Sequence, residues 1–208
     1  MKSLLLGASA LSLAFLVNPV FAAPDQPGHQ SPAPGTSHES MSAVKDATAG
    51  VVGKMDAAMT RTAKGFVEAA AISDMYEVEA GKLASERGKS QAVRQFGEQM
   101  VAAHTDSTNK LKSILASNKL AITPPSSLDS RRQGMIDDLK GAKEADFDHR
   151  YAVQQVAAHK EADTLMSGYA KHGDNDAIKS FAREIDPVVK QHLAMAQKLE
   201  KGPGMAKK

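Results

Sequence analysis

Four long segments of this sequence carry apolar residues at the spacing of an α-helix, and none carries the alternation of a β-strand. They run from about Thr62 to Glu86, from Gln91 to Ser117, from Lys143 to His172, and from Asp174 or Asn175 to just before Gly202. Each segment has one apolar face, so the four are expected to bury these faces against one another. The sequence therefore predicts an all-α protein built on an antiparallel four-helix bundle over residues 61–201.

The links between these helices constrain the topology. Gly88 and Gly173 end the first and third helices, as residues suited to a left-handed conformation do, and the next helix follows within a few residues. Short links of this kind predict two antiparallel hairpins. In the longer second link, Pro124-Pro125 cannot continue a helix, and a short helix reaching about Leu139 follows. A link of this length permits a crossing from one end of the bundle to the other, as in ferritin-like bundles.

The first 22 residues have the composition of a secretory signal. A basic Lys2 precedes an apolar run from Leu4 to Val17, and a small-residue cleavage pattern ends at Ala22. The pattern predicts cleavage near Ala22 and a mature protein that is periplasmic or secreted. No later stretch approaches the ~20 apolar residues of a membrane span, so we expect no transmembrane segment in the mature protein.

Two further regions flank the bundle on its N-terminal side. Residues 23–40 are rich in proline, glycine and serine, which predicts a flexible linker. Residues 41–60 have helical spacing interrupted by Gly50 and Gly53, each of which costs a helix about 1 kcal/mol relative to alanine. We therefore predict a marginal additional N-terminal helix, which leans on the bundle or contacts a protein partner. Residues 202–208 should form a flexible tail.

Composition argues against several kinds of partner and site. The chain has 26 basic and 24 acidic side chains, a balance that gives no electrostatic reason to expect nucleic acid as a partner. With three Tyr, six Phe and no Trp, it offers few platforms for stacking bases. It has no cysteine, which excludes disulfides and a thiolate metal site. The basic pair Arg131-Arg132 is expected to be solvated.

Three of the four helices carry a histidine on the midline of the face expected to be buried. These are His104, His159 and His192, and the remaining helix presents Glu77 on its inner face. A buried imidazole without a partner costs about 1–3 kcal/mol, so these residues need partners. One explanation is a mononuclear metal site with three nitrogen ligands and the Glu77 carboxylate, a donor set that suits Zn, Cu, Ni or Fe.

The surroundings of this cluster leave alternatives open. Asp148 and Gln155 fall on the same helical face as His159. They are expected to hydrogen-bond the metal ligands on the side that faces away from the ion. The metal-free alternative is a buried polar network, in which the histidines bond to Glu77, Asp148, Gln155, Tyr76 or one another and fix the register of the helices. In a further alternative the histidines lie at different depths and never meet, because periodicity does not give depth along a helix.

Enzymatic activity has little support in the sequence. A di-iron centre of the ferritin-like type needs Glu-x-x-His on two helices. Here Val101, Val156 and Val189 occupy the position three residues before each histidine, which disfavours such a centre. No strand-turn-helix elbow or glycine-rich phosphate loop is present to organise a hydrolase or nucleotide site. The sequence thus favours a binding or scaffold protein over an enzyme.

Three stretches carry a resemblance to a known family, namely FVEAAAISDMYEVEAGKLASERGKSQAVRQFGEQMVAAHT, ADFDHRYAVQQVAAHKE and PVVKQHLAMAQ. Over about residues 62–200, the chain resembles a family of exported bacterial proteins catalogued as domain of unknown function 4142 and often labelled as outer membrane proteins. The resemblance implies a ferritin-like bundle and export, and it supplies no activity. The family pattern has an aspartate directly before the histidine of the second helix, where this chain has Ala103. The role of orienting that imidazole is then missing or passes to Asp106.

Together these features predict an exported ferritin-like helical-bundle protein that binds one transition-metal ion. The alternative function is a non-enzymatic interaction or stress-related scaffold whose buried histidines are structural.

Overall fold

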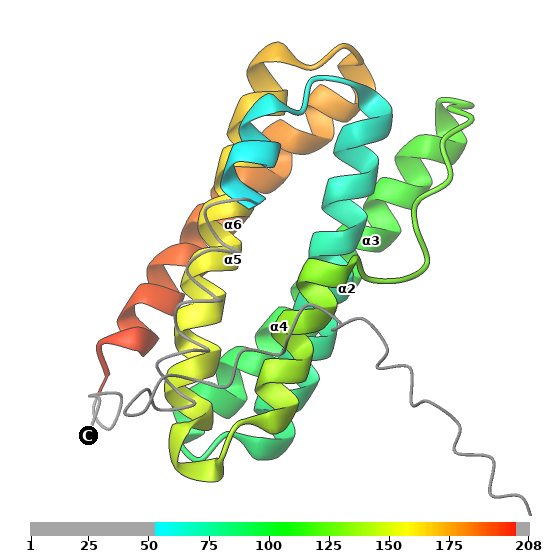
Figure 1. Cartoon of the computed structure of the whole chain (residues 1–208). Helices are drawn as coiled ribbons and strands as arrows, with labels where there is room; N and C mark the ends of the chain where they lie inside the picture. The colour runs from blue at the N-terminus through cyan, green and yellow to red at the C-terminus, as the bar shows by residue number, and fades with distance from the viewer. Residues whose placement is uncertain (1–52, 203–208) are drawn as a thin grey trace, which may run out of the picture. The chain divides into compact units, whose positions relative to one another are not determined.

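The structure is a computed structural model and describes residues 53–202. Its helices are α2 (Ala63–Arg87), α3 (Gln91–Ser117), α4 (Ser130–Gly141), α5 (Glu144–His172) and α6 (Asp176–Glu200) (Figure 1). Residues 53–59 are also helical, and no strand occurs between residues 53 and 202. The prediction of an all-α helical bundle is confirmed. The predicted signal, the linker, most of the N-terminal helix and most of the tail lie outside the described residues.

Local side-chain chemistry fixes where the helices begin. The side chains of Thr62, Ser90 and Asn175 each accept a hydrogen bond from a backbone N–H three residues later, at the starts of α2, α3 and α6. Each bond satisfies a first-turn N–H that has no partner within the helix. Gly88 follows α2 as predicted, but its φ is −57° rather than left-handed. Glycine fits there because a Cβ would lie 2.6 Å from the carbonyl oxygen of Ala84.

The helix contacts define the topology. α2 pairs with α3 and α5 with α6, while α2 also packs against α5 and α3 against α6. Near the start of α2, the ring of Phe66 lies 4.4 Å from that of Tyr169 near the end of α5. Further along α2, the Tyr76 hydroxyl donates to Gln154, which comes earlier in α5. α2 and α5 are therefore antiparallel, so α3 and α5 run in the same direction.

Because α3 and α5 share a direction, the link between them returns along the length of the bundle. Ferritin-like bundles have one long crossover of this kind. The assignment to the ferritin-like fold beyond this topology stays a prediction. The crossover contains α4, which packs on α2 and α5 and buries Met135, Ile136 and Leu139.

Two glycines allow α2 and α3 to approach closely. A Cβ added to Gly81 would lie 2.7 Å from the carbonyl oxygen of Gly97, and one added to Gly97 would lie 2.6 Å from that of Gly81. Larger side chains at either position would push the helices apart. This contact therefore helps to set both the spacing and the register of the hairpin.

Two apolar clusters fill the bundle, one after the other along its axis. The first contains Phe96 and Tyr151, and the second contains Phe66 and Phe181. On each long helix the two clusters are separated by a short interval, and each interval holds a buried polar residue: Asp74 on α2, His104 on α3, His159 on α5 and His192 on α6. The core thus has a polar layer between two apolar ones.

None of the helices between residues 53 and 202 combines the length and the apolar character needed to cross a membrane.

Candidate metal centre

Three histidines meet in the polar layer. The ring centres of His104 and His159 are 5.7 Å apart, those of His104 and His192 are 5.7 Å apart, and those of His159 and His192 are 5.5 Å apart. Each ring offers one nitrogen such that these three nitrogens lie within 4.8 Å of one another. The residues are only 6%, 1% and 4% exposed in the same order. The structure thus brings together the three predicted nitrogen ligands, each from a different helix.

Hydrogen bonds orient two of the three rings. Nδ1 of His104 lies 2.7 Å from Oδ1 of Asp74 on α2. Nδ1 of His159 lies 3.0 Å from the backbone carbonyl oxygen of Gln155, one turn earlier on α5. A carbonyl oxygen can only accept, so Nδ1 of His159 carries the proton, and Nε2 of the neutral ring carries a lone pair. Metal-bound histidines are held in this way by partners on their other nitrogen.

Each of the three rings also has a buried nitrogen with no protein partner. Nε2 of His104, Nε2 of His159 and Nδ1 of His192 are buried and make no hydrogen bond. Most buried polar atoms in proteins are hydrogen-bonded, so three such atoms in one cluster call for an explanation. With metal–nitrogen bonds of about 2.0–2.1 Å, the ring centres of three ligands of one ion lie roughly 5–5.5 Å apart. The observed spacing of the ring centres, 5.5–5.7 Å, is close to this value.

Burial controls the protonation of the cluster. Burial, followed by the charge of His104, lowers the pKa of His159 to about 3. Burial and the charges of the other two histidines lower the pKa of His192 to about 4. Burial acts on His104 as well, but the hydrogen bond and charge of Asp74 and the charge of Glu77 outweigh it and raise the pKa of His104. Near neutral pH, His159 and His192 are therefore neutral and hold lone pairs available to an ion.

Glu77 lies beside the cluster rather than within it. Its Oε2 accepts a hydrogen bond of 2.7 Å from Nε2 of Gln155, and its Oε1 lies 3.7 Å from Nδ1 of His159. That nitrogen is on the side of the ring away from the unpartnered Nε2. Burial raises the pKa of Glu77, although the nearby charges of His104 and Arg132 act in the opposite direction. The Glu77 carboxylate thus lies on the Nδ1 side of His159 and is hydrogen-bonded to Gln155, a residue that the sequence predicted near the histidines.

Asp148 does not take part in the cluster, which corrects the expectation that it would hydrogen-bond a ligand. Its two carboxylate oxygens each accept a 2.8 Å bond, from the backbone N–H groups of Lys89 and Ser90. These groups belong to the turn before α3. Asp148 therefore shares a stripe with His159 but lies about three turns away from it along α5, where it anchors the hairpin turn.

The orienting carboxylate comes from a residue that the sequence analysis missed. Asp74 holds His104, and its second oxygen accepts a 3.1 Å bond from the Thr108 hydroxyl. Asp106, the alternative carboxylate for this role, is exposed. Asp74 precedes Glu77 by three residues and so shares its helix face. This three-residue spacing was the sequence signal that could have placed Asp74 on the inner face of α2.

Arg132 is a second residue that sequence reasoning misplaced, since its predicted solvation is wrong. The side chain is 1% exposed and lies with its guanidinium 4.7 Å above the ring of Tyr76. Its Nη2 is 3.0 Å from Oε2 of Glu161, which also binds Arg131 through both carboxylate oxygens. Stacking on an aromatic face and pairing with a carboxylate make the burial of this charge tolerable.

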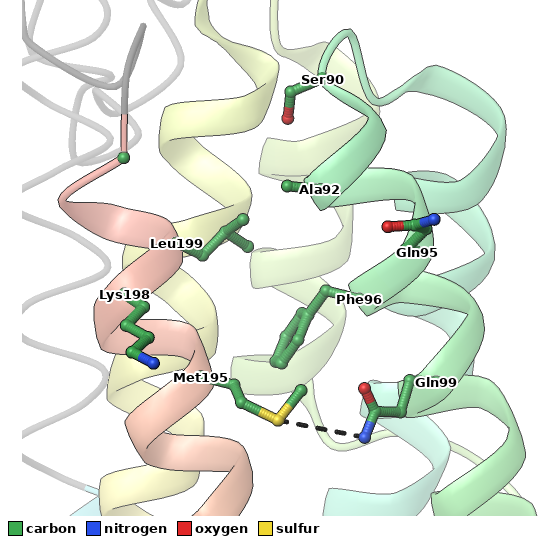
Figure 2. A pocket seen from close by; sticks show the side chains of 9 residues that line it. Ser90, Ala92, Gln95, Phe96, Gln99, Met195, Lys198 and Leu199 are labelled. Atoms are coloured by element: carbon green, nitrogen blue, oxygen red, sulfur yellow. Dashed lines mark hydrogen bonds between the residues drawn. The ribbon is translucent and has the colours of Figure 1, made fainter.

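A separate groove lies between the first half of α3 and the last turns of α6 (Figure 2). It has a volume of about 620 Å³, and none of the three histidines lines it. Figure 2 shows Phe96 and Leu199 on its walls and the contact between Gln99 and Met195, whose nitrogen and sulfur are 4.0 Å apart. The ring centre of Phe96, which lines this groove, is 6.4 Å from that of His159.

Comparison with known proteins gives a family and no activity. The family model described as a domain of unknown function (DUF4142) matches residues 51–199. No curated protein and no solved structure matches the chain.

Proposed function

The chain belongs to the family described as a domain of unknown function (DUF4142), and we propose that its bundle binds one transition-metal ion through His104, His159 and His192. Two observations carry this proposal: one nitrogen of each ring converges with one nitrogen of each other ring, and each ring has a buried nitrogen without a hydrogen-bond partner. Each such nitrogen costs about 1–3 kcal/mol when left unsatisfied. One ion would satisfy all three at once.

In this proposal, His104 and His159 bind through Nε2, and His192 binds through Nδ1. The contacts of Asp74 with His104 and of the Gln155 carbonyl with His159 support the assignment, because each holds the nitrogen that would not face the ion. Zinc, copper, nickel and iron all accept imidazole ligands, so the ion belongs to this group. Three protein ligands would leave a fourth position for water or another small ligand.

Glu77 then contributes charge rather than a metal–oxygen bond. Its position behind His159 would offset part of the positive charge of the ion, and Gln155 holds its carboxylate in place. The proposed site also serves one ion rather than two, because the group of converging ligand atoms between residues 53 and 202 holds three imidazoles and no carboxylate. Metal binding, rather than oxygen activation at a pair of ions, is therefore the proposed function.

Export completes the proposal and rests on residues 1–22 of the sequence. Fractionation of the native cells, followed by N-terminal sequencing, tests it. We expect a mature chain that begins near Ala23 outside the cytoplasm. A cytoplasmic chain that retains residues 1–22 would contradict export without affecting the metal site.

The metal content of untagged, full-length mature protein tests the central proposal. We expect about one ion per chain after incubation with Zn²⁺ or Cu²⁺ and dialysis, and loss of most of it in His159→Ala. His172→Ala is the matched control, because it removes an exposed histidine from the same helix. His159→Gln, which keeps a polar side chain, provides a second variant, and circular dichroism checks that both remain helical. Equal metal content in the wild type and in both His159 variants would overturn the proposal.

The competing function is an interaction scaffold in which the histidines are structural. It is favoured by the bonds that already fix His104 and His159 without an ion. Thermal unfolding separates the two functions. A bound ion stabilises the fold by RT ln(1 + [L]/Kd), about 2.7 kcal/mol at 100 times Kd. A melting temperature that responds to neither added metal nor chelator would favour the scaffold.

A further inference from the structure

A small cavity adjoins the histidine cluster. It has a volume of about 30 Å³ and is bordered by two of the three rings, those of His104 and His192. Ser73, Asp74 and Ser107 form part of its polar wall, and Met166 is part of its apolar wall. The carboxylate oxygens of Asp74 are already bound to His104 and Thr108. A water molecule needs about 10–15 Å³ of such volume. The cavity therefore has room for about two waters, or for one molecule of two or three non-hydrogen atoms.

The cavity extends toward the surface between α3 and α6. Val188 of α6 lines it and is 40% exposed, and Ala103 of α3 lines it and is half-buried. The small side chain at Ala103 leaves this side of the cavity lightly covered. Among the cavities described between residues 53 and 202, this one is lined by His104 and His192, and it offers an approach to them past Ala103 and Val188.

We infer that this cavity binds a small inorganic ligand, an anion or a neutral molecule of two or three non-hydrogen atoms, which occupies the fourth position of the bound ion. The inference rests on the proposed function, since it needs the ion. The ligand would coordinate the ion at one end, and Ser73 and Ser107, which line the same cavity, have hydroxyl groups that would donate hydrogen bonds to the other end. The volume excludes organic molecules of ordinary metabolite size.

Azide titration of the Co²⁺-loaded protein tests this inference, because the visible absorption of Co²⁺ reports a change of ligand. We expect a saturable change that corresponds to one azide per ion. Imidazole, which has five non-hydrogen atoms, should cause no such change at the same concentrations. Ala103→Leu fills the approach and should weaken azide binding at least about tenfold, with the Co²⁺ content unchanged.

Ala102→Leu is the matched control, since Ala102 is the exposed neighbour of Ala103 and does not line the cavity. Val188→Phe narrows the same approach from α6 and serves as the second variant where Ala103→Leu does not fold. A protein that binds Co²⁺ but gives no azide response, or that accepts imidazole as readily as azide, would refute this inference and leave the proposed function standing. A protein that binds none of Co²⁺, Zn²⁺ and Cu²⁺ would refute both.

Discussion

The contact between Asp74 and His104 offers a direct test of how the proposed metal site is built. Both side chains are almost fully buried, and the oxygen–nitrogen distance is 2.7 Å. In Asp74→Asn the side-chain oxygen can still accept the bond from Nδ1 of His104, but the negative charge is lost. Hydrogen bonds to charged groups contribute about 1.5–3 kcal/mol and neutral ones about half as much, so the metal-free protein should lose about 1 kcal/mol of stability.

The same change should weaken metal binding more than stability. Loss of a carboxylate behind a metal-bound histidine typically costs about 10–100-fold in affinity, or about 1.4–2.7 kcal/mol. The pKa of His104 should also fall relative to the wild type, because Asp74 raises it against the lowering effect of burial. Competition with a chromogenic chelator measures the affinity, and NMR titration of the metal-free protein measures the pKa.

Asp106→Asn is the matched control for this experiment. Asp106 is only two residues from His104 in the sequence but is exposed. The control should change neither the metal affinity nor the pKa of His104. The reasoning would be refuted by an Asp74→Asn protein that binds metal as tightly as the wild type, or by equal effects of the two variants.

Other predictions concern stability. Below pH 6.5, unfolded histidine takes up a proton while folded His159 and His192, with pKa values lowered to about 3 and 4, do not. The metal-free protein should therefore lose about 1.4 kcal/mol per pH unit for each of them as the pH falls toward 4.5, measured by urea unfolding. Gly81→Ala should cost about 1–3 kcal/mol in the same assay, because the new Cβ meets the backbone of α3. Gly134→Ala, whose Cβ meets nothing within 4 Å, should instead stabilise α4 by up to about 1 kcal/mol. Arg132→Met should destabilise the fold by about 1–3 kcal/mol, since it leaves Glu161 with one fewer cation and removes the contact with Tyr76.

Much of the fold follows from local sequence signals. The end of α2 at Gly88 and the helical periodicity predicted helix bounds close to those observed. These features depend on interactions within one or two turns, which a single sequence displays directly. The same periodicity placed His104 and His159 on the inner faces of their helices, where the structure has them.

The sequence by itself determined which residues of each helix point inward, but only the tertiary structure decided which of them meet. Periodicity gives the angle of a side chain around its helix and not its height along the bundle. That height depends on contacts between helices, such as the approach of Gly81 to Gly97, and on the length of the crossover. For this reason Asp148 was predicted beside the histidines from its angle alone, whereas the heights of the helices bring Asp74 to His104 and move Asp148 to the end of the bundle.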